Sequence, residues 1–192
     1  MSHTRLGNQL KQTKLEPLEK EILQGCLLGD GTLSQAGKHY RLRIEHQSKD
    51  KEYVEWKFQF LKRLCISGVQ YVSDHDSFRF GTVGHPEITT LRQVWYDPVK
   101  QVPSDLVLTP RMLAIWFMDD GTRHRDTIDI SVHSFSEQSL DILRNQIASF
   151  GFQTTVNSDA KGKRLYFIKK SYPGFERLTK PYMLKCMARK LP

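Results

Sequence analysis

The sequence predicts a mixed α+β protein made of two tandem copies of one αββαββα unit. Two observations lead to this prediction. An apolar helix ending on Asp-Gly-Thr occurs in each half of the chain, and the elements that follow these helices recur in the same order. A unit present twice in tandem is expected to form a pseudo-twofold pair with a shared interface, rather than a solenoid. We place the first copy at 1–96, a linker with two prolines at 97–108 and the second copy at 109–192.

Two apolar helices define the repeat. Residues 16–30 and 109–121 carry apolar side chains at three- and four-residue spacing, which is typical of a helix with a buried face. Thr109 is expected to cap the second helix, and glycine suits the position just past each helix end. Both helices finish on the same triplet, at 30–32 and at 120–122.

The remaining elements also recur. In the first half, a strand, a helix, two hairpin strands and a final helix are expected at 40–47, 49–64, 69–73, 77–83 and 86–96. In the second half, they are expected at 127–134, 136–150, 152–158, 164–170 and 174–188, with hairpin turns at 74–76 and 159–163. Apolar residues alternate along 40–47 and 127–134, so one face of each strand should be buried and the other exposed.

The composition is that of a basic globular protein. Of 192 residues, 39% are hydrophobic and 26% charged, and the net charge is +8. A basic balance favours a polyanionic partner, although many surfaces are basic for solubility alone. No apolar stretch is long enough to span a bilayer, and the N-terminus lacks the apolar region of a secretory signal. We therefore expect a protein that is intracellular, in a bacterial cytoplasm or an organelle, and neither secreted nor membrane-bound.

The three cysteines give no sign of a disulfide or zinc framework. Cys26, Cys65 and Cys186 are odd in number and far apart along the chain. A disulfide scaffold is dense in cysteine, and a zinc site needs closely spaced ligands. We therefore expect free thiols.

Asp30 and Asp120 are the candidate metal ligands. If the two apolar helices lie side by side, their terminal carboxylates become neighbours, which is unfavourable unless a cation separates them. Oxygen ligands with open positions favour Mg²⁺, which contacts phosphate oxygens and supports phosphodiester hydrolysis. For either residue alone, a simple helix-ending Asp-Gly turn is the preferred interpretation. The symmetric occurrence of both, at helix ends where the dipole disfavours a carboxylate, favours a metal site.

Two lysines share the same register. Lys100 and Lys190 stand at equal sequence distances from Asp30 and Asp120, and each is followed closely by a proline. A basic group near each carboxylate would polarise an attacking water or offset charge on a phosphate. A solvated surface lysine is the alternative for each. Their common register favours the functional interpretation.

These residues carry a family resemblance. The stretches LQGCLLGDG at 23–31 and LAIWFMDDG at 113–121 resemble the two signature helices of LAGLIDADG homing endonucleases in their single-chain form. The resemblance covers nearly the whole chain and implies the fold of that family, with a saddle-shaped DNA-binding sheet. It implies a monomeric nuclease, without an obligate protein partner, that makes double-strand breaks in DNA at a long recognition site, as in intron homing.

The resemblance also implies a metal-dependent mechanism. The implied metal ligands are the carboxylates of Asp30 and Asp120 and, just before them, the backbone carbonyls of Gly29 and Asp119. Lys100 and Lys190 would act near the metals as further catalytic residues. Mg²⁺ is the expected cofactor, with Mn²⁺ as a substitute and Ca²⁺ supporting binding without efficient cleavage.

Polar residues on the exposed strand faces are the candidate contacts to double-stranded DNA. In the first half these are Arg41, Arg43, Glu45, Gln47, Ser77 and Arg79. In the second half they are Asp129, Ser131, His133, Gln153, Thr155, Asn157, Arg164 and Lys170, the last two placed on the final strand. Arg and Gln suit guanine and adenine edges in the major groove, whereas Lys mostly neutralises phosphate. Arg123, His124 and Arg125 are expected to contact the DNA backbone near the scissile phosphates.

Several residues are given a structural role. His46 and His133 are interpreted as ordinary strand histidines without a catalytic function. Trp56, Trp95 and Trp116 lie at helical spacing with other apolar residues and are expected in the core.

Two other functions remain open on the same scaffold. One is an RNA-binding intron maturase, and the other is a DNA-binding regulator without catalysis, because a fold does not fix a function. Retention of both Asp30 and Asp120, together with both lysines, favours the nuclease. An intein is disfavoured because the chain starts at Met1 and lacks a terminal His-Asn.

Overall fold

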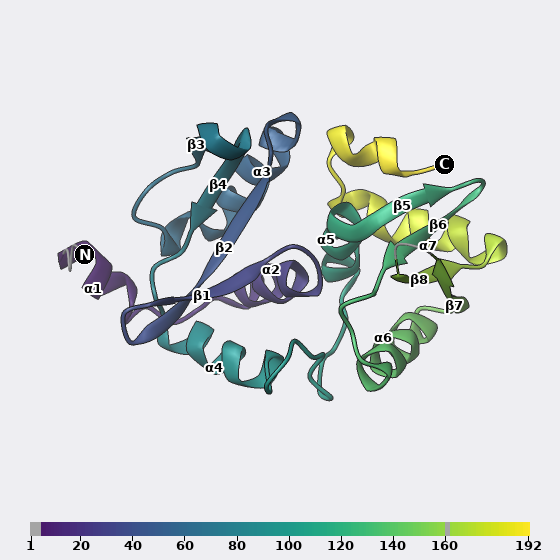
Figure 1. Ribbon diagram of the computed structural model, residues 1–192, viewed down its shortest axis with the longest axis horizontal. Coiled ribbons are helices and arrows are strands. Elements are labelled where there is room, and N and C mark those ends of the chain that lie inside the picture. The colour runs from purple at the N-terminus through teal and green to yellow at the C-terminus, as the bar shows by residue number, and fades with distance from the viewer. Residues whose placement is uncertain (1–4, 160–161) are drawn as a thin grey trace. The chain divides into compact units, whose positions relative to one another are not determined.

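The computed structural model describes residues 5–159 and 162–192, and it divides into two compact units, Met1–Val94 and Trp95–Pro192. The division lies two residues before the expected end of the first copy, and the segment 97–108 belongs to the second unit. Within the described ranges, no helix has the length and apolar character needed to cross a membrane. The order of helices and strands is followed in Figure 1.

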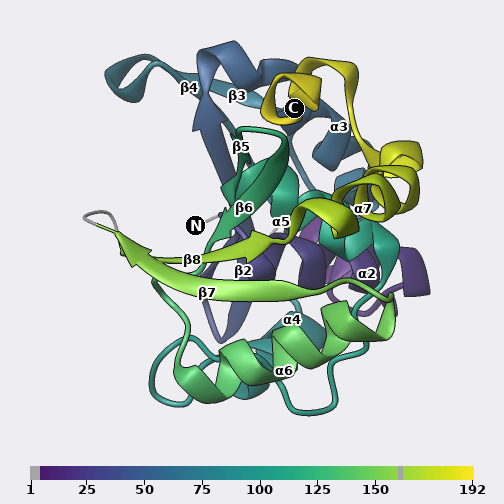
Figure 2. The same cartoon turned by 90° about the vertical axis from the view of Figure 1, so that its right-hand side faces the viewer.

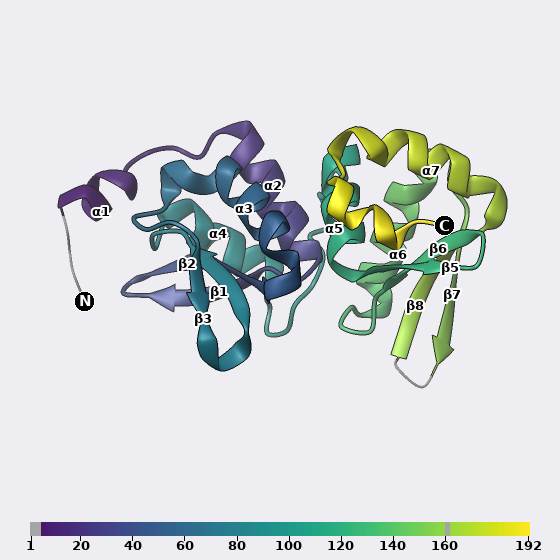
Figure 3. The same cartoon turned by 90° about the horizontal axis from the view of Figure 1, so that it is seen from above.

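The first unit is a four-stranded antiparallel sheet with its helices gathered on one side, as Figure 3 shows. Its strands are β1 (Thr32–Ala36), β2 (His39–Gln47), β3 (Gln70–Val72) and β4 (Ser77–Gly81), in the order β1-β2-β4-β3. Its helices are α1 (Arg5–Leu10), α2 (Pro17–Leu28), α3 (Lys51–Leu61) and α4 (Pro86–Trp95), whose last residue falls in the second unit, with 3-10 turns at Ser48–Asp50, Lys62–Leu64 and Ser73–His75. The helix α3 packs on β2 and β4.

The second unit repeats this topology. Its strands are β5 (Gly121–His124), β6 (Thr127–Ser131), β7 (Thr154–Asp159) and β8 (Gly162–Phe167), in the order β5-β6-β8-β7 (Figure 2). Its helices are α5 (Pro110–Asp120), α6 (Glu137–Ser149) and α7 (Tyr172–Thr179), with 3-10 turns at Lys169–Ser171, Lys180–Tyr182 and Lys185–Lys190. The identical strand order in both sheets confirms the tandem repeat and the α+β class.

The two signature helices begin with different caps. In α2, a capping box joins Glu16 and Glu19, and the Glu19 carboxylate accepts the Glu16 backbone N–H at 2.8 Å. In α5, the expected cap is confirmed, because Thr109 Oγ1 accepts the Met112 backbone N–H at 3.2 Å. Each helix has proline in its first turn, where the missing N–H has no cost.

The core of each unit lies between its sheet and its helices. Trp95 and Trp116 are fully buried, as expected, whereas Trp56 is half-buried. The helices α3 and α6 bury residues at the same spacing. These are Tyr53, Val54, Lys57 and Leu61 in α3 and Ser139, Leu140, Leu143 and Ile147 in α6.

Several elements differ from those expected from the sequence. The first strand of each sheet, β1 and β5, was included in the αββαββα pattern but was not located along the chain. The expected helix at 174–188 is instead the short helix α7 followed by two 3-10 turns, because Pro181 interrupts the α-helical hydrogen bonding. In the expected turn at 159–163, Asp159 belongs to β7 and residues 162–163 belong to β8, while residues 160 and 161 lie outside the described residues.

Candidate active site and nucleic-acid interface

Asp30 follows the end of α2, where the chain turns into β1. Gly29 caps the helix, and the backbone N–H of Gly31 donates to the Cys26 carbonyl at 2.8 Å. A Cβ atom at Gly31 would lie 2.7 Å from that carbonyl oxygen, so the turn requires glycine. The Asp30 side chain is 48% exposed. The turn therefore presents an open carboxylate beside the sheet of the first unit.

Asp120 is the last residue of α5, and Gly121 caps this helix, whereas Asp30 follows the cap of α2. Gly121 leads directly into β5, and a Cβ atom there would overlap the ring and carbonyl of Phe117. Asp119 and Asp120 are both half-buried. At the end of each signature helix, an aspartate is thus followed by a glycine, and a side chain in place of that glycine would force its neighbours to move.

Lys190 lies at the C-terminal end of α5. Its Nζ donates to the carbonyl of Met118 at 2.6 Å and to the carbonyl of Asp119 at 2.7 Å. These carbonyls belong to the last turn of a helix, where a cation is favoured by the helix dipole. Within one unit, these hydrogen bonds therefore place the lysine at the end of the helix that carries Asp120, which the sequence did not reveal.

Lys100 has a different environment. Residues Tyr96 and Lys100 form an isolated antiparallel bridge, and the Lys100 Nζ lies 5.3 Å from the centre of the Phe135 ring. Lys100 belongs to the second unit and Asp30 to the first. Its action beside Asp30 stays a prediction.

The oxygen donors at each helix end are of the kind that a hard divalent cation prefers. Each unit offers a carboxylate and a backbone carbonyl, without sulfur, which is the ligand chemistry of Mg²⁺ and Mn²⁺. The exposure of the Asp30 carboxylate leaves room for water ligands, which Mg²⁺ retains. Among these donors, the Asp119 carbonyl already accepts from Lys190. Metal ligation by Asp30, Asp120, Gly29 and Asp119 stays a prediction.

The sequence interpretation missed the surroundings of Asp30. The Nδ1 atom of His46 lies 3.7 Å from the Asp30 carboxylate, and its Nε2 lies 3.2 Å from Nζ of Lys57. From the sequence, His46 is interpreted as an ordinary strand histidine, and Lys57 lies within the helix expected at 49–64. The only sequence signal was a lysine at a position of α3 that the helical spacing assigns to the buried face.

The polar face of the first sheet carries three arginines around a hollow. The hollow is lined by Arg41, Arg43, Ser67, Gly68, Gln70, Arg79, Phe80 and Gly81. Arg43 pairs with Glu45 at 3.8 Å, and the arginines keep part of their surface exposed. Gln70 was not among the candidates, because its short strand gives a weak sequence pattern. Guanidinium groups in such a hollow suit guanine edges or phosphates.

Ser77 is a correction on this sheet. It was expected on the exposed face, but it is 4% exposed and its Oγ donates to Glu45 at 2.6 Å. The hydroxyl is satisfied by its neighbour, so Ser77 orients Glu45 and does not present a free group. Glu45 is half-buried and Gln47 is exposed.

Asp129 is a correction on the second sheet. It was expected to face outward, but it is 3% exposed. Its carboxylate accepts from Arg164 Nε at 2.6 Å and from Thr122 Oγ1 at 3.0 Å, and His124 Nδ1 lies 3.6 Å away. Arg164 also contacts Thr122. The polar face of this sheet therefore holds a closed ion-pair network, which lowers its free positive charge.

Most other candidates on the second unit are exposed. The exposed ones are Arg123, Arg125, His133, Gln153, Thr155, Asn157 and Lys170. Ser131 is half-buried, and its Oγ lies 2.8 Å from His133 Nδ1. Lys170 lies in the 3-10 turn Lys169–Ser171 and not on a strand, because β8 ends at Phe167. Their contacts with DNA stay predictions.

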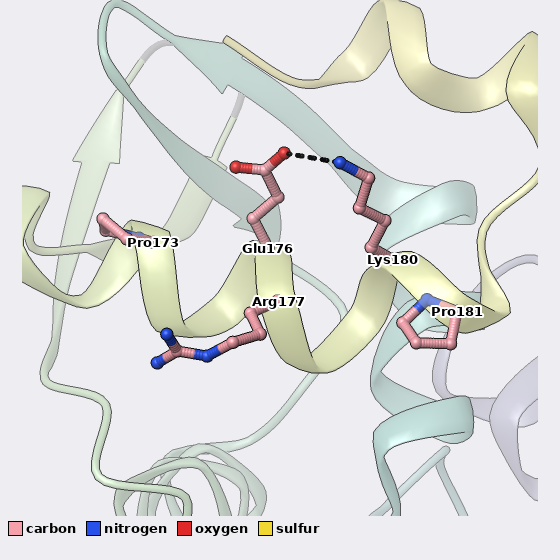
Figure 4. Close-up of a pocket in the computed structure, with 5 residues that line it drawn as sticks. All are labelled: Pro173, Glu176, Arg177, Lys180 and Pro181. Atoms are coloured by element: carbon pink, nitrogen blue, oxygen red, sulfur yellow. Dashed lines mark ion pairs between the residues drawn. The ribbon is translucent and has the colours of Figure 1, made fainter.

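A second hollow lies along α7 (Figure 4). It is lined by Pro173, Glu176, Arg177, Lys180 and Pro181, and Glu176 pairs with Lys180 at 3.8 Å across one helical turn. This ion pair is of the exposed i,i+4 kind, which contributes little. We assign this hollow no part in the site.

Comparison with known proteins finds a family match over most of the chain. The model described as the LAGLIDADG DNA endonuclease family matches residues 20–175. DNA endonuclease I-ChuI of Chlamydomonas applanata is 26% identical, over 90% of this chain and 94% of its own. Cytochrome b mRNA maturase bI2 of Debaryomyces hansenii is 24% identical, over 92% of this chain and 75% of its own.

A third relative is a longer protein. Protein RecA of Mycobacterium gastri is 31% identical over 89% of this chain, and the chain spans only 46% of that relative's length.

Solved structures show the same fold. The homing endonuclease I-WcaI bound to its DNA recognition sequence matches with a TM-score of 0.86 and 24% identity, over 99% of this chain and 93% of its own. I-DmoI in complex with DNA and Mn matches with a TM-score of 0.58 and 16% identity, over 85% of this chain and 97% of its own. Both likenesses confirm a fold with two four-stranded sheets.

Proposed function

Because the chain belongs to the LAGLIDADG DNA endonuclease family, in its single-chain form with two motifs, we propose that it is a site-specific homing endonuclease. It breaks both strands of double-stranded DNA at a long recognition site by divalent-metal-dependent phosphodiester hydrolysis. One observation carries this proposal: each unit ends an apolar helix on Asp-Gly beside a four-stranded sheet with a polar face.

The helix ends supply the chemistry in this proposal. Asp30 and Asp120 hold the divalent cations, together with the carbonyls of Gly29 and Asp119. A bound Mg²⁺ or Mn²⁺ supplies activation of a water and stabilisation of the leaving oxygen. Lys190 binds the Asp119 carbonyl at the end of the helix that carries Asp120, and from there its ammonium group offsets charge that develops on a phosphate. Lys100 has the corresponding role for Asp30.

The sheets supply the recognition surface. Arg41, Arg43 and Arg79 of the first sheet reach base edges and phosphates, because their guanidinium groups stay partly exposed. The second sheet contributes smaller polar groups, such as Thr155 and Asn157, on exposed positions of β7. Neutralisation of several phosphates makes the affinity fall steeply with salt.

A maturase is the second candidate function. The matched relative named Cytochrome b mRNA maturase bI2 favours it, since the same scaffold is found in a protein named for that activity. A maturase has no need of an aspartate at both helix ends. The exposed Asp30 carboxylate therefore supports the nuclease over the maturase.

The function is tested by selection from a randomised DNA duplex library. Duplexes are bound in Ca²⁺, and the enriched pool is then transferred to Mg²⁺. Cleavage of both strands by the wild type, and its loss in Asp30→Asn or Asp120→Asn with DNA affinity retained, is the expected result. Asp126→Asn is the matched control, because Asp126 is an exposed acid on the β5–β6 turn that pairs with Lys169.

Other outcomes point elsewhere. Enrichment without cutting would identify a DNA-binding regulator. Absence of enrichment, together with binding of structured intron RNA, would identify the maturase. Undiminished cutting by both asparagine variants would refute metal ligation by these aspartates.

A further inference from the structure

A lysine occupies a core position of the first unit that is apolar in the second. The buried residues of α3 and α6 correspond one to one in spacing, and Lys57 of α3 stands where α6 has Leu143. Lys57 is 0% exposed, as Leu143 is. The fold can therefore fill this position with an aliphatic side chain.

A histidine faces the same core position from the sheet. Thr32 pairs with Arg43 in the first sheet, and Thr122 pairs with Asp129 in the second, each threonine lying after its Asp-Gly. By this register His46 corresponds to Val132, which is buried. The second unit thus has Val132 and Leu143 where the first has His46 and Lys57.

The two polar side chains are joined to each other and to the site. Nζ of Lys57 lies 3.2 Å from Nε2 of His46 and 4.2 Å from the centre of the Tyr53 ring. The His46 side chain is 10% exposed, and its Nδ1 lies 3.7 Å from the Asp30 carboxylate. The three residues Asp30, His46 and Lys57 form a chain of contacts from the helix end into the core.

The chemistry of lysine fixes the orientation of the histidine. The charged form of lysine has only donors, so in that form Lys57 donates to Nε2 of His46, and the proton of a neutral His46 ring then lies on Nδ1. Nδ1 is the ring nitrogen that lies 3.7 Å from the Asp30 carboxylate. Outer partners of this kind orient the ligands of a metal site.

Stability gives no reason for this arrangement. A buried ammonium group loses its hydration, and apolar residues of similar volume at such positions are often neutral or stabilising. The second unit shows that the same helix and sheet pack with leucine and valine. The first unit alone has the costly polar pair at these positions. We therefore infer that the pair has a function that is confined to the first unit.

We propose that His46, held by Lys57, is a positioning residue that orients the Asp30 carboxylate, and that the centre at Asp120 lacks this support. This inference rests on the proposed function. It follows that the two DNA strands are cut by unequal centres. Loss of the pair slows the cleavage of one strand by roughly 10- to 100-fold, as for other outer partners of metal ligands, and leaves the other strand unchanged.

The variants exchange the residues of one unit for those of the other. Lys57→Leu and His46→Val install the residues that the second unit has, so both variants are expected to fold, which thermal unfolding checks. His46→Asn keeps an N–H donor on a short side chain and should retain more activity than His46→Val. Leu143→Met is the matched control in α6.

The first measurement needs neither metal nor DNA. Nitrogen NMR of histidine-labelled protein reports which ring nitrogen carries the proton, and His46→Val identifies the signal of His46. We expect the Nδ1–H form in the wild type and its loss in Lys57→Leu, with no change in Leu143→Met. A His46 signal that is unaffected by Lys57→Leu would overturn the proposal.

The second measurement follows each strand of the selected site with a separate label. Lys57→Leu and His46→Val should accumulate duplexes nicked in the same strand, whereas Leu143→Met should cut both strands like the wild type. Equal slowing of both strands would overturn the inference while leaving the nuclease intact. If the wild type cuts neither strand, the proposed function is refuted. The NMR measurement still tests the contact between Lys57 and His46 in that case.

Discussion

The ammonium group of Lys190 donates to the carbonyl of Asp119 at 2.7 Å, and it thereby joins the last 3-10 turn of the chain to the end of α5. A second hydrogen bond to Met118 completes the contact. Lys190 thus satisfies carbonyls that the helix itself leaves without partners. A residue two positions from the last one in the sequence is tied to the helix that ends on Asp120.

Replacement of Lys190 should affect both stability and cleavage. In Lys190→Met the carbonyls lose a charged donor, so the free energy of unfolding should fall by about 1–2 kcal/mol. Cleavage should fall further than stability explains, since the proposed role of the ammonium group is to offset charge at the centre of Asp120. Urea unfolding and cleavage assays at a temperature where the variant is folded measure the two effects.

Lys185→Met provides the control, because Lys185 is an exposed lysine of the same turn. Its stability and cleavage should match those of the wild type. A Lys190→Met variant that loses stability but cleaves at the wild-type rate would restrict Lys190 to a structural role.

The network around Asp129 gives a second prediction. Arg164→Met removes the main partner of a carboxylate that is 3% exposed, and the uncompensated charge should lower the free energy of unfolding by roughly 3 kcal/mol. Asp129→Asn combined with Arg164→Met removes the charge as well and should recover part of that loss. Chemical unfolding of the two single variants and the double variant completes the cycle. Additive effects would show that the two side chains do not interact.

The tandem architecture follows from patterns that the sequence carries openly. Apolar spacing and glycine at the helix ends identify α2 and α5, and alternation identifies β2 and β6. The short strands β1 and β5 have no such alternation, because they carry mostly polar residues and are exposed or half-buried along most of their length. Their position comes from pairing with β2 and β6, which is a tertiary property.

The site was predictable only in part. The aspartates are identified by their repeated Asp-Gly context, which is local in sequence. The burial of Asp129 depends on Arg164, which lies on a different strand, so alternation alone assigned it to the wrong environment. Likewise, Lys57 looks like an ordinary charged residue of an amphipathic helix until the buried face of α3 is known.

Cys65 gives a prediction that depends on pH. Burial, assisted by the nearby Glu19 charge, raises the pKa of its thiol to about 12, and Sγ donates to the Leu61 carbonyl at 3.3 Å. The thiolate is the reactive form, so Cys65 in the folded protein should react with iodoacetamide at pH 8.5 roughly 100-fold or more slowly than in the unfolded chain. Because the folded pKa lies above the ordinary value of 9.0, the stability contributed by the neutral thiol is lost as the pH rises from about 9 towards 12.

Mass spectrometry of alkylated peptides measures this rate with and without urea. Cys65→Ser, compared with the wild type, should show a smaller decrease in stability between pH 9 and 11, since serine does not ionise in this range. Fast alkylation of native Cys65 at pH 8.5 would contradict the assigned environment.

The glycine after Asp30 gives the last prediction. In Gly31→Ala the new methyl group meets the Cys26 carbonyl at 2.7 Å, which is closer than two such atoms approach, so the end of α2 must shift. Overpacking of this kind costs about 1–3 kcal/mol of unfolding free energy. The displaced turn should also move Asp30, so cleavage should fall even where the protein remains folded. Gly68→Ala is the matched control, because a Cβ there meets nothing within 4 Å and its stability should stay near that of the wild type. If Gly31→Ala has the stability and the cleavage rate of the wild type, the turn accepts a side chain and the glycine does not hold Asp30 in place.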